Sequence, residues 1–152
     1  MKKIKSKNVT QEYIEKATPG KGVKTIQDGF KDVNGEKTGA NWLHSTFGGD
    51  IVLLADNNPQ GESNPDYLWK NKLWDLKSLT TDNKNTIDNR IRHGVKQTLK
   101  NPGGLLLDYS ESPLKLSKAI IETDTYAQKR AKATIDVIIK KGEKYRVIRV
   151  EK

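Results

Sequence analysis

Residues 65–77 read PDYLWKNKLWDLK, with two aromatic-rich runs on either side of the polar segment Lys70-Asn71-Lys72. Aromatic and aliphatic runs joined by a short polar segment predict a β-hairpin, with strands at 67–69 and 73–76. Because side chains alternate between the two faces of a strand, Asp75 and Lys77 are expected on one face, and Trp74 and Leu76 on the other.

The length of the turn decides where Asp66 lies. A two-residue turn at Lys70-Asn71 places Asp66 directly across from Asp75, and a turn at Asn71-Lys72 places it across from Lys77. A three-residue loop would instead place Asp66 across from Leu76, on the wrong face. Both two-residue turns therefore predict one polar face that carries Asp66, Asp75 and Lys77.

Two carboxylates opposed on a sheet repel each other unless a cation lies between them. Mg²⁺ suits such a pair, because it prefers oxygen ligands and keeps several of its waters. We therefore expect Asp66 and Asp75 to hold Mg²⁺, and Lys77 to orient a water or to neutralise developing charge. The alternative is an exposed strand with an ordinary Asp–Lys ion pair.

Outside the hairpin, the hydrophobic pattern alternates between helices and short strands. It predicts helices at 10–17, 40–47, 85–100 and 112–132, and strands at 51–54, 105–107, 135–139 and 145–150. This order indicates an α/β fold with a mixed sheet flanked by helices. Residues 1–39 are expected to form a tether and outer layer, with Thr10 capping the first helix, and residues 40–152 to form the main domain.

The composition narrows the classes of function. The chain has 28 Lys and Arg against 19 Asp and Glu, a net charge of +9, no Cys and two His. Thiolate chemistry, disulfides and three-histidine zinc sites are thereby excluded. No apolar run is long enough to span a membrane, and we expect no classical signal segment, because no apolar segment follows the first lysines. The positive charge favours a phosphate polyanion or an acidic partner.

The helix at 85–100 carries a polar row beside its apolar stripe. Arg90, His93 and Gln97 follow one another at three- and four-residue steps, so they share one face, which could meet the hairpin. We expect Arg90, His93 and the neighbouring Lys96 to contact substrate. His44 is the candidate base of a metal-independent alternative, in which a histidine removes the ribose 2′-hydroxyl proton.

Two levels of motif support a family resemblance. Pro65-Asp66 with Asp75-Leu76-Lys77 resembles the PD-(D/E)XK motif of metal-dependent nucleases. Further segments carry a wider similarity over most of residues 18–150: Thr18-Pro19-Gly20-Lys21-Gly22, Ala40-Asn41-Trp42-Leu43-His44, Phe47-Gly48-Gly49-Asp50-Ile51 and Asn101-Pro102-Gly103-Gly104-Leu105-Leu106-Leu107-Asp108. Together these segments resemble the C-terminal tRNase domain of bacterial contact-dependent growth-inhibition toxins and related phage and polymorphic-toxin nucleases.

The resemblance implies an endoribonuclease toxin that cleaves tRNA with Mg²⁺. Within it, Asp66, Asp75 and Lys77 match the catalytic motif, and Gln97 matches a helix residue that supports the catalytic lysine, with Lys96 as a poorer match. The resemblance also implies a cognate immunity protein that inhibits the toxin. Delivery by a larger effector protein, action in the cytoplasm of the target bacterium and a monomeric state are expected with it.

The sequence departs from the PD-(D/E)XK pattern at one point. The first helix of that fold often supplies a further acid, and residues 40–47 contain none, which leaves Glu12, Glu15, Glu36 or Asp50 as substitutes.

Two alternatives to a metal-dependent nuclease stay open. Related toxin domains are grouped with the barnase, colicin and RelE-like ribonucleases, which cleave RNA without metal. A non-catalytic module that binds RNA or an acidic partner is the second alternative.

Overall fold

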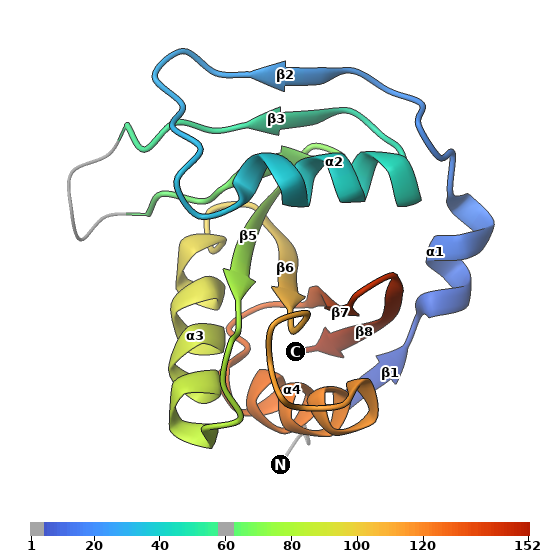
Figure 1. The fold of residues 1–152 in the computed structure, drawn as a ribbon, viewed down its shortest axis with the longest axis vertical. Coiled ribbons are helices and arrows are strands. Elements are labelled where there is room, and N and C mark those ends of the chain that lie inside the picture. The colour runs from blue at the N-terminus through green and yellow to red at the C-terminus, as the bar shows by residue number, and fades with distance from the viewer. Residues whose placement is uncertain (1–4, 58–62) are drawn as a thin grey trace.

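The computed structural model describes residues 5–57 and 63–152, and these form one mixed sheet with helices packed on both of its faces (Figure 1). The described strands are β1 (Lys5–Asn8), β2 (Lys24–Ile26), β3 (Ile51–Leu53), β4 (Tyr67–Trp69), β5 (Lys72–Ser78), β6 (Pro102–Asp108), β7 (Ile135–Lys141) and β8 (Lys144–Glu151). The described helices are α1 (Thr10–Lys16), α2 (Glu36–Thr46), α3 (Lys84–Gln97) and α4 (Leu116–Arg130).

The strands follow the order β1-β8-β7-β6-β5-β4-β3-β2 across the sheet. β5, β6 and β7 are parallel neighbours, β2 is parallel to β3, and the other four pairs are antiparallel. The predicted α/β class, a mixed sheet flanked by helices, is confirmed. No helix in the described part of the chain is long and apolar enough to cross a membrane.

The hairpin turn is the two-residue one. Lys70 and Asn71 have φ angles of 53° and 64°, so both adopt the left-handed conformation of a type I′ turn. Tyr67 pairs with Trp74 and Trp69 pairs with Lys72. The same register, continued one residue further, places Asp66 across from Asp75, as the first of the two turn alternatives requires.

The sheet separates two hydrophobic clusters. The first, under α2, contains Leu43 and Phe47 together with Trp69 and Trp74 of the hairpin. The second lies beneath α3 and α4 and contains Ile87, Ile91 and Val95 of α3 packed on the central strands. The side chains of β5 therefore alternate between the two faces of the sheet: Trp74 lies on the face that α2 covers, and Asp75 and Lys77 lie on the face that α3 covers.

Helix α2 begins four residues before the predicted start. Its first turn is Glu36-Lys37-Thr38-Gly39, which contains no large apolar residue, so the hydrophobic period does not reveal it. The earlier start places Glu36 on a helix. The predicted cap at Thr10 is wrong: α1 has no side-chain cap, and Thr10 Oγ1 accepts the amide of Val147 instead (2.9 Å).

The first 39 residues supply strands at both edges of the sheet. β1 pairs with β8, and β2 pairs with β3. Neither strand was predicted, because Lys5-Ser6-Lys7-Asn8 has no apolar alternation and every residue of β2 is exposed. Edge strands bury little surface, so their sequences carry little of the pattern on which such a prediction depends.

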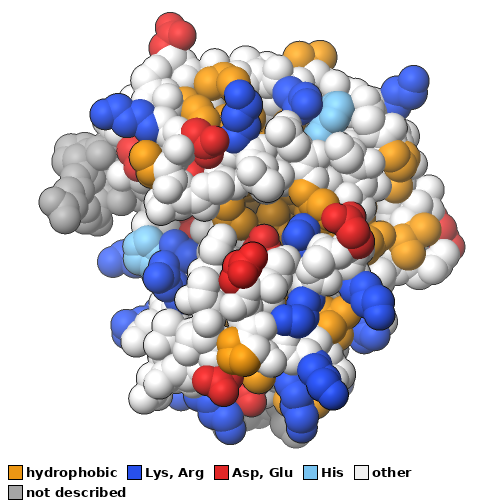
Figure 2. Space-filling view, viewed as in Figure 1, with side chains coloured by type: hydrophobic (Ala, Val, Ile, Leu, Met, Phe, Trp, Pro, Cys, Tyr) orange, Lys and Arg blue, Asp and Glu red, His pale blue; other side chains and the backbone are white. Residues whose placement is uncertain are grey.

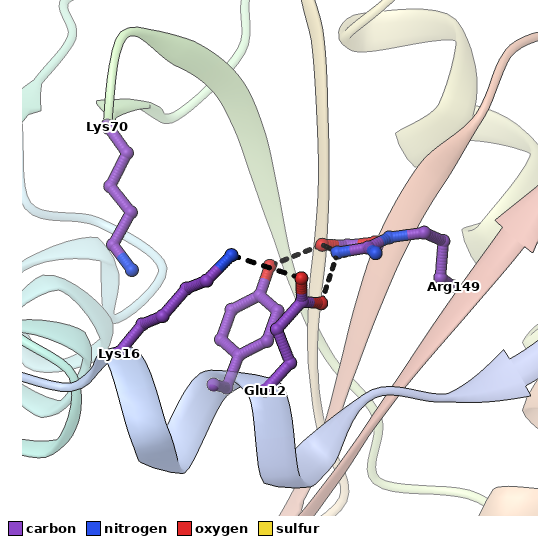
Figure 3. Close-up of a pocket in the computed structure, with 6 residues that line it drawn as sticks. Glu12, Lys16, Lys70 and Arg149 are labelled. Carbon is purple, nitrogen blue, oxygen red and sulfur yellow. Dashed lines mark hydrogen bonds and ion pairs between the residues drawn. The ribbon is translucent and has the colours of Figure 1, made fainter.

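An ionic network attaches α1 to β7 and β8 (Figure 3). The Tyr13 hydroxyl donates to Asp136 Oδ2 (2.6 Å), and Arg149 reaches both Asp136 (2.7 Å) and Glu12 (2.8 Å). Lys16 pairs with the same Glu12 (3.1 Å). These groups line a cavity of about 160 Å³, but because its carboxylates are already paired with cations, we assign it to anchoring α1.

Replacing Tyr13 by Phe should lower the free energy of unfolding by about 1–2 kcal/mol, because it removes one hydrogen bond to a charged group and keeps the ring packed on Phe47. Urea denaturation measures the change. Tyr126→Phe is the matched control, since the Tyr126 hydroxyl makes no hydrogen bond within the described residues. Equal effects of the two substitutions would show that the network does not stabilise the fold.

Candidate active site

A cleft of about 510 Å³ lies where the open end of the β4–β5 hairpin meets the start of α2 and the second half of α3. In the same view as Figure 1, the surface is hollowed below α2, and acidic and basic side chains lie around the hollow (Figure 2). The residues that line the cleft are Asn34, Glu36, Asp56, Asn64, Asp66, Asp75, Leu76, Lys77, Ser78, Arg90, His93 and Gln97.

Two carboxyl groups lie at the centre of this cleft. Asp75 is on β5 and is 2% exposed, and Asp66 precedes β4 on the opposing strand. The backbone amide of Leu76 donates to Asp66 Oδ2 (2.7 Å), which orients this carboxyl toward β5. The hairpin register thus brings together two acids that are nine residues apart in sequence.

Both carboxyls resist ionisation. Burial, and then the neighbouring Asp75, raise the pKa of Asp66 from 3.8 to about 9. Burial also raises the pKa of Asp75, although the ammonium group of Lys77 opposes the rise. Without a cation between them, the pair is therefore most stable when it retains a proton, and Asp66 holds that proton because Lys77 favours the ionised form of Asp75.

A chain of polar contacts joins Asp75 to helix α3. Lys77 Nζ lies 3.0 Å from Asp75 Oδ2 and 2.8 Å from His93 Nδ1, and His93 Nε2 lies 3.1 Å from the side-chain amide nitrogen of Gln97. Burial, and then Lys77, lower the pKa of His93, so the ring is neutral at pH 7. Lys77 is thus held between a carboxyl and a neutral imidazole, with its ammonium group in the cleft.

Gln97 connects this chain to the hairpin from the other side. Its Oε1 accepts the backbone amide of Asn64 (2.5 Å), and its carbonyl accepts the hydroxyl of Ser63 (2.6 Å). Both contacts hold the segment that leads into Asp66. Gln97 is therefore a positioning residue, which places α3 and the entry to β4 relative to each other.

Gly94 allows α3 to lie directly over β5. A Cβ at this position would come within 2.7 Å of a methyl group of Leu105 and within 3.5 Å of Asp75 Oδ2. A larger residue would require the end of the Leu105 side chain or the helix itself to shift. The close approach brings His93 within hydrogen-bond distance of Lys77.

Helix α2 contributes a third acid. Glu36 is 8% exposed, lines the cleft with Asp66, and adds to the repulsion that raises the pKa of Asp66. The Tyr67 hydroxyl donates to the carbonyl of Glu36 (2.6 Å), so the start of α2 is attached to β4. Of the four substitutes considered for the missing helix acid, Glu36 is the one that lines the cleft.

The carboxylate oxygens of Asp66 and Asp75 suit a hard divalent cation that takes few of its ligands from the protein. Asp75 Oδ2 is buried, and no donor within the described residues reaches it with hydrogen-bond geometry. In residues 5–57 and 63–152, no group of three or more His, Asp and Glu side chains is arranged to hold a metal ion. A metal at Asp66 and Asp75 would therefore keep most of its waters, as Mg²⁺ commonly does.

Six of the eight predicted site residues line the cleft: Asp66, Asp75, Lys77, Arg90, His93 and Gln97. Lys96, on the same helix, is exposed and does not line it. His44 also lies outside it, and its Nε2 is 2.8 Å from the carbonyl of Gly22. Asn34 and Asp56 also line the cleft but were not predicted, since only the folded loops before α2 and after β3 bring them there.

Comparisons with known proteins agree with this fold. A family model described as the contact-dependent growth inhibition CdiA C-terminal domain matches residues 62–144, more than half of the chain. The fold is similar to that of a chain from the CdiA-CT/CdiI toxin and immunity complex of Burkholderia pseudomallei, with 16% identity and a TM-score of 0.55 over 81% of this chain and 97% of that chain. No curated protein matches the sequence.

Replacing Asp66 by Asn should stabilise the metal-free protein more at pH 8 than at pH 5. A carboxyl whose pKa is raised on folding stabilises the fold fully only below its unfolded value of about 3.8, and this stability is lost as the pH rises toward 9. Asn keeps the acceptor for Leu76 and cannot ionise. We expect the midpoint of thermal unfolding in EDTA to rise by at least about 3 °C at pH 8, which is about 1 kcal/mol.

Asp50→Asn is the control, because Asp50 lies outside the cleft and its Oδ1 accepts the amide of Val23, a contact that Asn can keep. An equal shift of the Asp66 variant at both pH values would contradict the assignment of a raised pKa to Asp66.

Proposed function

Because this chain belongs to the family of contact-dependent growth inhibition CdiA C-terminal domains, we propose that it inhibits growth as a nuclease that hydrolyses phosphodiester bonds in RNA. The observation that carries the proposal is the pair of opposed carboxyls, Asp75 buried and Asp66 half-buried, with Lys77 beside them in an open cleft. The net charge of +9 supports a polyanionic substrate. Among RNAs, tRNA is the substrate proposed, on the family resemblance of the sequence.

Asp66 and Asp75 are the residues that would hold Mg²⁺, and Glu36 stands near them on α2. Mg²⁺ at such a site would supply Lewis-acid polarisation of the phosphate and a water of lowered pKa. In the hydrolysis, the water oxygen forms a bond to phosphorus and gives up a proton, one P–O ester bond breaks, and the leaving oxygen takes up a proton, so that one water is consumed.

The side chains of the cleft have separate roles in this reaction. The ammonium group of Lys77, beside Asp75 in the cleft, would orient the water and neutralise the charge that develops on the phosphate. His93, a neutral ring, holds Lys77 in place from α3. Arg90, exposed at the rim of the cleft, attracts the phosphate backbone of the substrate.

We also propose a cognate immunity protein as inhibitor. The structure with a similar fold belongs to a toxin and immunity complex, and an acidic inhibitor would associate quickly with a chain of charge +9. Within the same proposal, a larger effector protein delivers the domain to the cytoplasm of the target bacterium. Loss of RNA cleavage on adding the purified inhibitor, with association that slows as salt rises, would test this partner.

Asp75→Asn should lower cleavage of total bacterial tRNA at least about 100-fold, because loss of even an outer-shell partner of a metal costs about 10–100-fold. The assay follows tRNA and plasmid DNA on gels, with Mg²⁺ or with EDTA, and circular dichroism checks folding. Asp50→Asn, outside the cleft, should cleave as the unmodified chain does.

Each other outcome points to a defined alternative. Full activity of a folded Asp75→Asn variant would remove the centre of the proposal. Cleavage that survives EDTA would favour the metal-independent mechanism, for which His93 beside Lys77 is better placed than His44. Salt-dependent binding of RNA without cleavage would favour a binding module.

A further inference from the structure

A second cavity, of about 280 Å³, opens directly beside the carboxyls of the cleft. It shares Glu36, Asp56 and Asp66 with the cleft, so the two spaces adjoin along these three side chains. Its remaining wall comes from the loop before α2 and from the end of β3: Gly29, Phe30, Lys31, Val33 and Leu54. Three of these five residues, Phe30, Val33 and Leu54, have apolar side chains, which the cleft lining has only at Leu76.

Phe30 is the large aromatic side chain of this wall. It is half-buried and packs against the hydrophobic cluster beneath α2, while it also lines the cavity. Val33, in the same loop, is 72% exposed. Neither hydrocarbon side chain has an acid, base or nucleophile for hydrolysis, and an aromatic ring left half-exposed beside a polar site is suited to stack on a planar ligand.

The loop is held in shape before any ligand arrives. The amide of Phe30 donates to the carbonyl of Gln27 (3.0 Å), and the amide of Asn34 donates to Glu36 Oε2 (2.8 Å). Asp32 Oδ1 accepts the amide of Lys37 on the first turn of α2 (3.2 Å). Because these bonds tie the loop to the helix that carries Glu36, the aromatic wall has a fixed place relative to the carboxyls.

An RNA phosphate at Asp66 and Asp75 carries a nucleoside on each side. We propose that the base next to the scissile phosphate leaves its helical stack and stacks on Phe30 in this cavity, with Lys31 near the adjoining backbone. This inference rests on the proposed nuclease function and adds its substrate class, which is RNA that is unpaired at the cleavage site. Paired RNA is disfavoured, because its base must first be unstacked and unpaired.

The test compares a single-stranded 12-mer RNA with the same strand in a duplex, using the full chain and its Phe30 variants. Phe30→Ala should lower kcat/KM on the single strand about tenfold or more, mainly through KM, and Phe30→Trp should restore it. Phe30→Leu keeps apolar packing on the cluster without an aromatic face, so it should lower kcat/KM as much as Phe30→Ala does. It also tests the role of the ring if the alanine variant does not fold. Ile121→Ala, an exposed site on α4 outside the cavity, is the matched control.

An abasic series locates the base. Once the cut is mapped, removal of the base at the neighbouring nucleotide should slow the unmodified chain about as much as Phe30→Ala does, and should leave Phe30→Ala unaffected. If removal of the base slowed the Phe30→Ala variant as much as it slows the unmodified chain, the inference would be overturned. Equal rates of cleavage of the single strand and the duplex would also overturn it.

A binding measurement separates this inference from the proposed function. RNA that carries 2-aminopurine should lose fluorescence on binding to the unmodified chain in EDTA, and lose less with Phe30→Ala or Phe30→Leu, because stacking quenches the base. If no nucleic acid is cleaved, the proposed function fails, and this quenching alone decides whether Phe30 binds a base. Equal quenching by the unmodified chain and both variants would overturn the inference.

Discussion

The register of the β4–β5 hairpin is the constraint on which the site depends. It is set by two consecutive residues, Lys70 and Asn71, in the left-handed conformation. A change of one residue in the pairing would move Asp66 to the face of Trp74 and Leu76, inside the hydrophobic cluster beneath α2. The same turn therefore determines both the packing of the aromatic side chains on one face and the opposition of two carboxyls on the other.

Two opposed carboxyls, one buried and one half-buried, destabilise the fold when both ionise, and the surrounding structure limits this effect. Lys77 pairs with Asp75, and His93 holds Lys77 from α3, which Gly94 allows to lie close to the sheet. Gln97 then ties the same helix to the segment that enters β4. The charge arrangement and the helix position thus depend on each other, and a cation at the carboxyls would complete the arrangement rather than create it.

The N-terminal part of the chain closes the cleft around this centre. Asp66, Asp75 and the polar row of α3 lie within the residues matched by the family model, 62–144. Glu36 and Phe30 lie before that range, on α2 and on the loop that leads to it. The proposed hydrolytic groups and the proposed base-binding wall therefore come from different parts of the sequence, so the wall could change while the carboxyls stay in place.

Features that depend on short-range periodicity could be predicted from the order of the residues alone. Alternation and turn chemistry predicted the hairpin and the shared face of Asp66, Asp75 and Lys77, and the apolar stripe predicted α3 with its row of His93 and Gln97. These patterns repeat every two or every 3.6 residues, so neighbouring residues suffice to reveal them.

Which distant elements meet is seen only in the folded chain. The side chains of Glu36 and Asp66 line one cleft because α2 starts beside β4, and His44 is turned away to the carbonyl of Gly22. Such contacts depend on strand order and on how closely helices approach the sheet. Both follow from packing over the whole chain, which no local pattern in the sequence contains.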